Sequence, residues 1–205
     1  MEVLMFALLR RGRSKAENAG KGESGLDKPA SDTKEQVQER FGAAVQSANT
    51  EYWHRPEPER TLAGCLRAAK IYSPFLSQEL DEQVKSHAAA LQGILLHEAY
   101  VLAKRAGAQD LAHRYLKRAC DTLEHGKDTV DPAAKGWAIY ILCWTYLQRG
   151  EPDHAESLLA DVMLAAESWD VPPERLGRLA GRIAKALAER NDAAKHVELK
   201  DVSLA

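Results

Sequence analysis

The chain has 205 residues and a formal net charge of −2, and 45% of its residues are hydrophobic while 28% are charged. This length and composition are typical of one folded domain with a hydrophobic core, and they exclude a fibrous or wholly disordered protein. The near-neutral charge gives no general argument for binding nucleic acid, so we expect no nucleic-acid partner.

Residues 1–33 are expected to form a flexible N-terminal tail. The apolar run at residues 1–9 is too short to span a bilayer, and arginines follow it, whereas a secretory signal has its basic residues first. We therefore expect no stable membrane insertion, while a peripheral membrane contact or organelle targeting by residues 1–13 stays open. Residues 12–33 are polar and glycine-rich and cannot bury enough apolar surface to become ordered.

Residues 34–203 are expected to form one domain built of helices. Ser31 or Asp32 is the expected cap of the first helix, which ends at a loop that contains two prolines. Its apolar residues recur at helical spacing: Phe41, Ala44, Val45 and Ala48. A second helix, at about 58–72, ends at Pro74, and the two form the first expected antiparallel pair.

The segment 77–106 carries an apolar residue at every third or fourth position, which predicts one long helix or two nearly collinear ones. Gly93 is the expected break, because glycine costs about 1 kcal/mol relative to alanine inside a helix. Gly107 provides the C-terminal stop, and Asp110 is the expected cap of the next helix, at 111–125.

The clearest helical hairpin comes next, with helices at 133–149 and 152–168. Asp131 is placed to cap the first of them, and Pro132 occupies the favoured first-turn position. A helix at 174–190 follows, and then a turn at Asn191 leads into a last short helix. Helix follows helix without a useful alternating segment, so the predicted fold class is all-α.

Two of these hairpins share one pattern after the glycine of the turn. The residues after Gly107 and those after Gly150 fall at the same intervals: Ala112, Leu116 and Ala119, then Ala155, Leu159 and Val162. Leu62, Leu66, Ala69 and then Pro74 repeat the second half of this pattern. Small residues at a helix crossing let two helices approach closely and stack on their neighbours.

Residues 136–168 resemble the tetratricopeptide repeat (TPR). The matching residues are Leu142, Tyr146, Ala155 and Leu159, while Ile139 and Cys143 replace the Trp and Gly of the family pattern. The TPR-like resemblance covers about residues 34–190. It implies antiparallel helix pairs stacked as an α-α superhelix, with about three hairpins and a C-terminal capping helix. A generic helical bundle is the alternative architecture.

The resemblance implies a concave side that binds a peptide or a partner helix and is lined by the first helix of each pair. Trp137, Tyr140 and Trp144 would lie there, and aromatic side chains are common interface anchors. Because their helix is apolar on two faces, either a partner or another part of the chain covers them. The equivalent face of the preceding hairpin is apolar and basic, which suits an amphipathic or acidic segment: Ile94, His97, Val101, Lys104 and Arg105.

The helix at 174–190 carries a basic stripe along one side: Arg175, Arg178, Arg182 and Lys185. Such a stripe is either a solvated face opposite the apolar one or a surface for an acidic partner or a phosphate.

The cysteines Cys65, Cys120 and Cys143 are odd in number and lie far apart in apolar helical patterns. We expect buried free thiols and a reducing, cytoplasmic setting. The histidines lack metal-ligand spacing, and no nucleophile motif or phosphate-binding loop is present in the sequence. We therefore expect no enzyme activity, no cofactor and no metal site.

The predicted function is a non-enzymatic protein-protein interaction module, either an adaptor, a scaffold or an assembly factor. It would bind a peptide or a partner helix in its concave groove. The alternative is a structural or regulatory subunit whose apolar faces are buried in a homo-oligomer.

Overall fold

The structure is a computed structural model, and it describes residues 33–77, 80–164 and 171–202. Within these ranges the chain is helical and contains no strand, so the all-α prediction is confirmed. The elements in chain order are α2 (Lys34–Ala48), the π-helical turn η1 (Asn49–Trp53), the 3-10 turn η2 (Glu57–Glu59), α3 (Leu62–Ile71), α4 (Ser73–Ser77), α5 (Glu82–Arg105), α6 (Gln109–Gly126), α7 (Pro132–Arg149), α8 (Pro152–Leu164) and α9 (Pro173–Val202).

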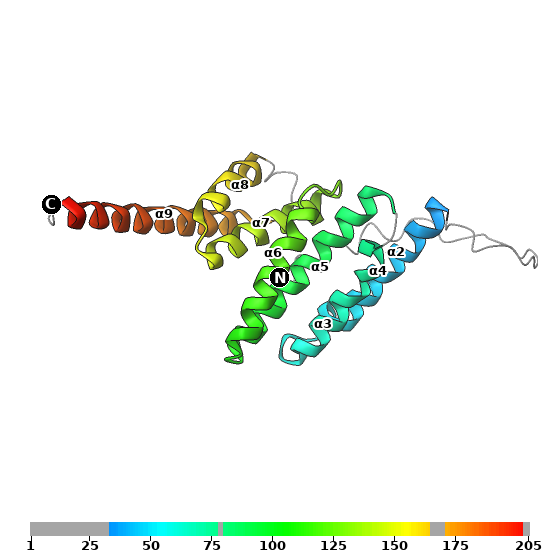
Figure 1. The fold of residues 1–205 in the computed structure, drawn as a ribbon. Helices are drawn as coiled ribbons and strands as arrows, with labels where there is room; N and C mark the ends of the chain where they lie inside the picture. The colour runs from blue at the N-terminus through cyan, green and yellow to red at the C-terminus, as the bar shows by residue number, and fades with distance from the viewer. Residues whose placement is uncertain (1–32, 78–79, 165–170, 203–205) are drawn as a thin grey trace, which may run out of the picture.

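The helices follow one another along the molecule in chain order (Figure 1). α2, α3 and α4 lie at one end, α5 and α6 lie in the middle, and α7 and α8 come next. α9 packs on α7 and α8 and then extends away from the rest of the fold (Figure 1). Sequence neighbours therefore pack together as the hairpin pattern predicted, whereas the α-α superhelix stays a prediction.

α5 and α6 cross at very short distance because glycines lie at two of their contact points. A Cβ on Gly126 would lie 2.3 Å from the backbone nitrogen of Ala90, and one on Gly93 would lie 2.6 Å from Cγ of Leu123. The expected break at Gly93 is therefore wrong, since α5 runs unbroken from Glu82 to Arg105. The packing against α6 offsets the low helix propensity of glycine.

The turn glycines that the repeat pattern singled out adopt the conformation that glycine favours. Gly107 and Gly150 have φ angles of +74° and +77°, in the left-handed region. Ala112 and Ala155, at matching positions after them, are 1% and 0% exposed and belong to hydrophobic clusters of the core. The shared pattern therefore reflects the same packing requirement in both hairpins.

Helix caps agree with the sequence only in part. Asp131 caps α7 as predicted, accepting a hydrogen bond of 2.8 Å from the backbone N–H of Ala134. α2 is capped by Thr33, which forms a capping box with Gln36; the expected caps Ser31 and Asp32 lie outside the described residues. Asp110 lies in the first turn of α6, and the cap position is Ala108.

Some predicted helix boundaries are also wrong. The second helix begins at Leu62 rather than near residue 58, and Pro74 lies in the first turn of α4, where its missing N–H breaks no hydrogen bond. α9 is one helix through Asn191, with no turn there. The expected end of α8 at residue 168 lies outside the described residues.

α7 is the central helix of the fold. It contacts α5, α6, α8 and α9, and all residues from 136 to 143 are buried. A helical segment that is buried on every side needs apolar residues on every face, which explains why residues 136–143 are apolar on two sides. Cys143 of α7 is buried, as are Cys65 and Cys120, and all are free thiols as predicted. No helix of the described residues has an apolar stretch long enough to cross a bilayer.

Candidate partner-binding groove

The first turns of α9 cover part of the aromatic face of α7. The guanidinium of Arg175 lies over the indole ring of Trp137, 5.3 Å from its centroid. Trp137 is only 2% exposed, and Ile94 of α5 is 4% exposed. Both were expected in the groove, and the structure places both in the core instead, because other helices of the same chain pack on them.

The aromatic residues of α7 lead from this core toward the surface. The rings of Trp137 and Tyr140 meet edge to face at 5.6 Å, and those of Tyr140 and Trp144 at 6.5 Å. Tyr140 is 9% exposed, whereas Trp144 is half-buried. Of the three predicted aromatic anchors, Trp144 is therefore the one that presents most of its ring to an occupant.

Trp144 lies between two pockets. The first has a volume of about 470 Å³ and is lined by Tyr140, Trp144, Arg175, Arg178, Gly181 and Arg182. The second has a volume of about 420 Å³ and is lined by His97, Tyr100, Val101, Lys104, Arg105, Trp144 and Gln148. Because Trp144 belongs to both, we treat them as one surface and call it the α5–α7–α9 groove. Each half has the size of a typical ligand pocket, roughly 300–1,000 Å³.

Hydrogen bonds hold the α5 side of the groove against α7. The hydroxyl of Tyr100 donates to Oε1 of Gln148 at 2.7 Å. Nζ of Lys104 donates to the hydroxyl of Tyr100 at 3.0 Å and to Oε1 of Gln148 at 3.2 Å. These contacts fix the position of the Lys104 ammonium at one end of the groove.

His97 contributes an uncharged ring rather than a cation. Burial lowers the pKa of His97 to about 4, so the imidazole is neutral near pH 7. Its ring lies 5.6 Å from that of Tyr100. The positive charge on the α5 side therefore comes from Lys104 and Arg105.

The groove carries five cationic side chains, namely Lys104, Arg105, Arg175, Arg178 and Arg182. None of the five forms an ion pair with a carboxylate of the described residues, although Arg105 interacts electrostatically with Glu98 on the same helix. Lys185, the fourth member of the predicted basic stripe, does not line the groove and instead pairs with Glu189 at 3.6 Å. The stripe is thus divided between the groove and the exposed side of α9.

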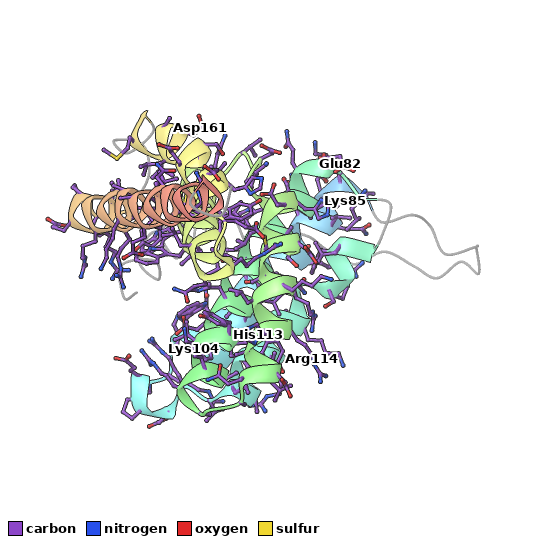
Figure 2. All side chains as sticks on the ribbon, turned by 60° about the vertical axis from the view of Figure 1, so that its left-hand side comes forward. Glu82, Lys85, Lys104, His113, Arg114 and Asp161 are labelled. Carbon is purple, nitrogen blue, oxygen red and sulfur yellow. The ribbon has the colours of Figure 1, made fainter. Side chains whose placement is uncertain are left out.

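Lys104 lies at the end of α5 opposite Glu82 and Lys85, and Asp161 of α8 lies on the far side of α9 from it (Figure 2). Glu82 is therefore remote from the Lys104 end of the groove, whereas Glu98, seven residues before Arg105 on α5, interacts with Arg105 electrostatically.

The structure joins two features that the sequence kept separate. The sequence predicted an aromatic and basic face on α5 and α7, and separately a basic stripe on α9. Part of each lines the same groove in the structure. The sequence prediction missed Tyr100, Gln148 and Gly181. Tyr100 and Gln148 could have been found, because each lies three or four residues from a predicted member on the same helix face. Gly181 carries no such signal.

The described residues contain no group of three His, Cys, Asp or Glu side chains placed to hold a metal ion. Comparisons of the chain with protein-family models, with curated proteins and with solved structures found no match.

Proposed function

We propose that this protein is a non-enzymatic interaction module, an adaptor, scaffold or assembly factor, that binds a segment of a partner protein in the α5–α7–α9 groove. The observation that carries the proposal is the position of Trp144, which is half-buried and shared by two adjoining pockets. A rigid aromatic ring between two hollows is a typical anchor point, since it gives a large contact area at low entropic cost.

The TPR-like arrangement remains part of this proposal. It is supported by the origin of the groove: α5 and α7, the first helices of two consecutive hairpins, each contribute a wall. α9 provides the third wall, as expected of a capping helix that packs on the last hairpin. A segment that lies along the groove would therefore contact three helices at once.

The test is a display screen of peptides drawn from natural proteins, followed by fluorescence anisotropy with each purified hit and the full chain. Trp144→Ala is expected to weaken binding at least about tenfold, since loss of an aromatic anchor costs about 2 kcal/mol or more. Tyr115→Ala is the matched control, because Tyr115 is a half-buried aromatic on α6 that does not line the groove. Trp137→Ala is unsuitable, since its effect would be loss of core packing.

Two results would contradict the proposal: no peptide binds, or every hit binds the Trp144→Ala variant as tightly as the wild type. Light scattering of the free protein at several concentrations tests the homo-oligomer alternative. A stable oligomer that Trp144→Ala dissociates would assign the groove to a second copy of the chain instead of a partner.

A further inference from the structure

We infer that the occupant of the α5–α7–α9 groove is an acidic amphipathic helix that packs a large apolar side chain on Trp144 and places carboxylates on both sides of it. This inference rests on the proposed function and adds the chemistry of the partner segment. The arrangement that carries it is an aromatic floor with Lys104 and Arg105 on one side and three arginines of α9 on the other.

The groove carries an excess of positive charge. None of its five cations forms an ion pair with a described carboxylate, and the one described carboxylate that interacts electrostatically with them is Glu98, with Arg105. Like charges gathered in a hollow repel one another and raise the local positive potential. An anionic occupant relieves this repulsion, whereas a cationic segment adds to it, so the charge discriminates between partners.

The arginines of α9 that line the groove are spaced for carboxylates on a partner helix. Arg175, Arg178 and Arg182 lie three and seven residues apart, on one face of the helix, and span about 10 Å along its axis. Glu or Asp residues at the same spacing on a partner helix present carboxylates over the same length. Guanidinium groups bind carboxylates in paired hydrogen bonds, which favours this match.

An aromatic and apolar floor lies between the two charged sides of the groove. It consists of the ring of Trp144 with Tyr140, Val101 and the uncharged ring of His97. An apolar side chain at the centre of the acidic helix face would bury against these groups. The groove therefore matches an amphipathic segment, with an apolar centre and acidic flanks, better than a uniformly charged one.

A nucleic acid is the competing anion, and the charge of the whole chain argues against it. The net charge is −2 even though the groove concentrates five cations, so the remaining surface carries an excess of negative charge. A long polyanion would extend beyond the groove onto that surface and be repelled, whereas a short segment lies within it.

The experiment uses the full chain and four synthetic helical peptides of about 18 residues, or five turns. The first has a central Leu flanked by Glu at helical spacing, the second replaces each Glu by Gln, the third replaces each Glu by Lys, and the fourth replaces the central Leu by Ala. A single-stranded RNA oligonucleotide of similar length is the fifth probe. The protein variants are Trp144→Ala, the pair Arg178→Glu with Arg182→Glu, and the pair Arg114→Glu with Lys117→Glu. The last pair lies exposed on α6 and changes the net charge equally.

The Glu peptide is expected to bind at least about tenfold more tightly than the Gln peptide and to weaken as salt rises. Replacing the central Leu, or Trp144 of the protein, is expected to cost a similar factor. The protein with Arg178→Glu and Arg182→Glu is expected to bind the Glu peptide weakly and the Lys peptide more tightly than the wild type does. The protein with the two α6 substitutions is expected to bind the Glu peptide within about twofold of the wild-type affinity.

The outcomes separate this inference from the proposed function. If the Glu and Gln peptides bind with equal affinity and neither binds the Trp144→Ala variant, the acidic character of the partner is overturned. The groove would then still bind protein segments. Failure of all four peptides would overturn the inference, while the display screen decides the proposed function independently. If the RNA binds more tightly than the Glu peptide, and if its binding depends on Arg178 and Arg182, the inference is wrong and the groove binds a nucleic acid.

Discussion

Arg175 of α9 lies over the indole ring of Trp137 of α7, with its guanidinium carbon 5.3 Å from the ring centroid. This contact joins the last helix to the central one and encloses Trp137 in the core. It is part of the packing of α9 on α7, which also brings the arginines at the next turns of the same helix face beside Trp144. One side chain thus takes part in both the packing of the fold and the assembly of the groove.

Replacing Arg175 by alanine is expected to lower the free energy of unfolding by about 0.5–1 kcal/mol, since the variant loses a cation–π contact. Urea denaturation measures this change. Arg178→Ala is the control, because Arg178 is exposed on the same helix and its effect is expected to stay within about 0.5 kcal/mol. Equal losses in both variants would show that the contact with Trp137 adds no stability.

A glycine at the α5–α6 crossing and a glycine on the open side of α9 are expected to respond in opposite ways to substitution by alanine. Gly126→Ala is expected to destabilise the fold by about 1–3 kcal/mol, because its new methyl group would lie 2.3 Å from the backbone of Ala90. Gly177→Ala on α9 is expected to stabilise it by up to about 1 kcal/mol, since a Cβ there meets no described atom within 4 Å. Chemical denaturation of both variants measures the difference. A neutral Gly126→Ala variant would contradict the close crossing.

The half-buried imidazole of His97 predicts a loss of stability in mild acid. Burial lowers its pKa from 6.5 to about 4 in the folded protein. Between these values the unfolded chain binds a proton that the folded chain does not. The stability from the neutral ring is therefore complete above about pH 6.5 and falls as the pH drops toward about 4, by at most about 1.4 kcal/mol per pH unit.

His97→Gln is expected to flatten this part of the stability profile, as measured by urea denaturation from about pH 7 to 4. Burial also lowers the pKa of His87, and the resulting change of stability with pH is the same in the wild type and the variant. The difference between the two profiles reports His97 alone. Parallel profiles would mean that His97 titrates normally in the fold.

The buried thiols are expected to be unreactive in the native protein. Burial raises the pKa of Cys143 to about 12 and raises the pKa of Cys65 and of Cys120 as well. Since the thiolate is the reactive form, a thiol reagent at about pH 8 should label the native chain slowly and all three cysteines after denaturation. Rapid labelling of one cysteine in the native state would reveal local opening of the helix that carries it.

The helices and their turns could be predicted from the sequence because each depends on nearby residues. Apolar periodicity located α5 and α7, and Gly107, Gly150 and Asp131 were recognised from local chemistry. The prediction was wrong at Gly93 and at Asn191 for a related reason. Both residues weaken a helix when considered locally, but α5 and α9 continue through them in the folded chain.

The groove could not be predicted in full, because its walls come from helices that are distant in the sequence. The aromatic residues of α7 and the basic residues of α9 were recognisable by type and spacing, but a helical period of 3.6 residues indicates only which side chains share a face. It does not indicate which other helix covers that face. For this reason Trp137 and Trp144, seven residues apart on one helix, looked equivalent in the sequence.

By itself, the sequence determined the all-α class, the positions of most helices and turns, the buried thiols and the residue types that make a candidate binding surface. Only the tertiary structure decided that α9 docks across α7, so that Trp137 is covered while Trp144 lies between two pockets. The physical reason is that this docking depends on packing between residues far apart in the chain, such as Arg175 and Trp137, and no local pattern records that contact.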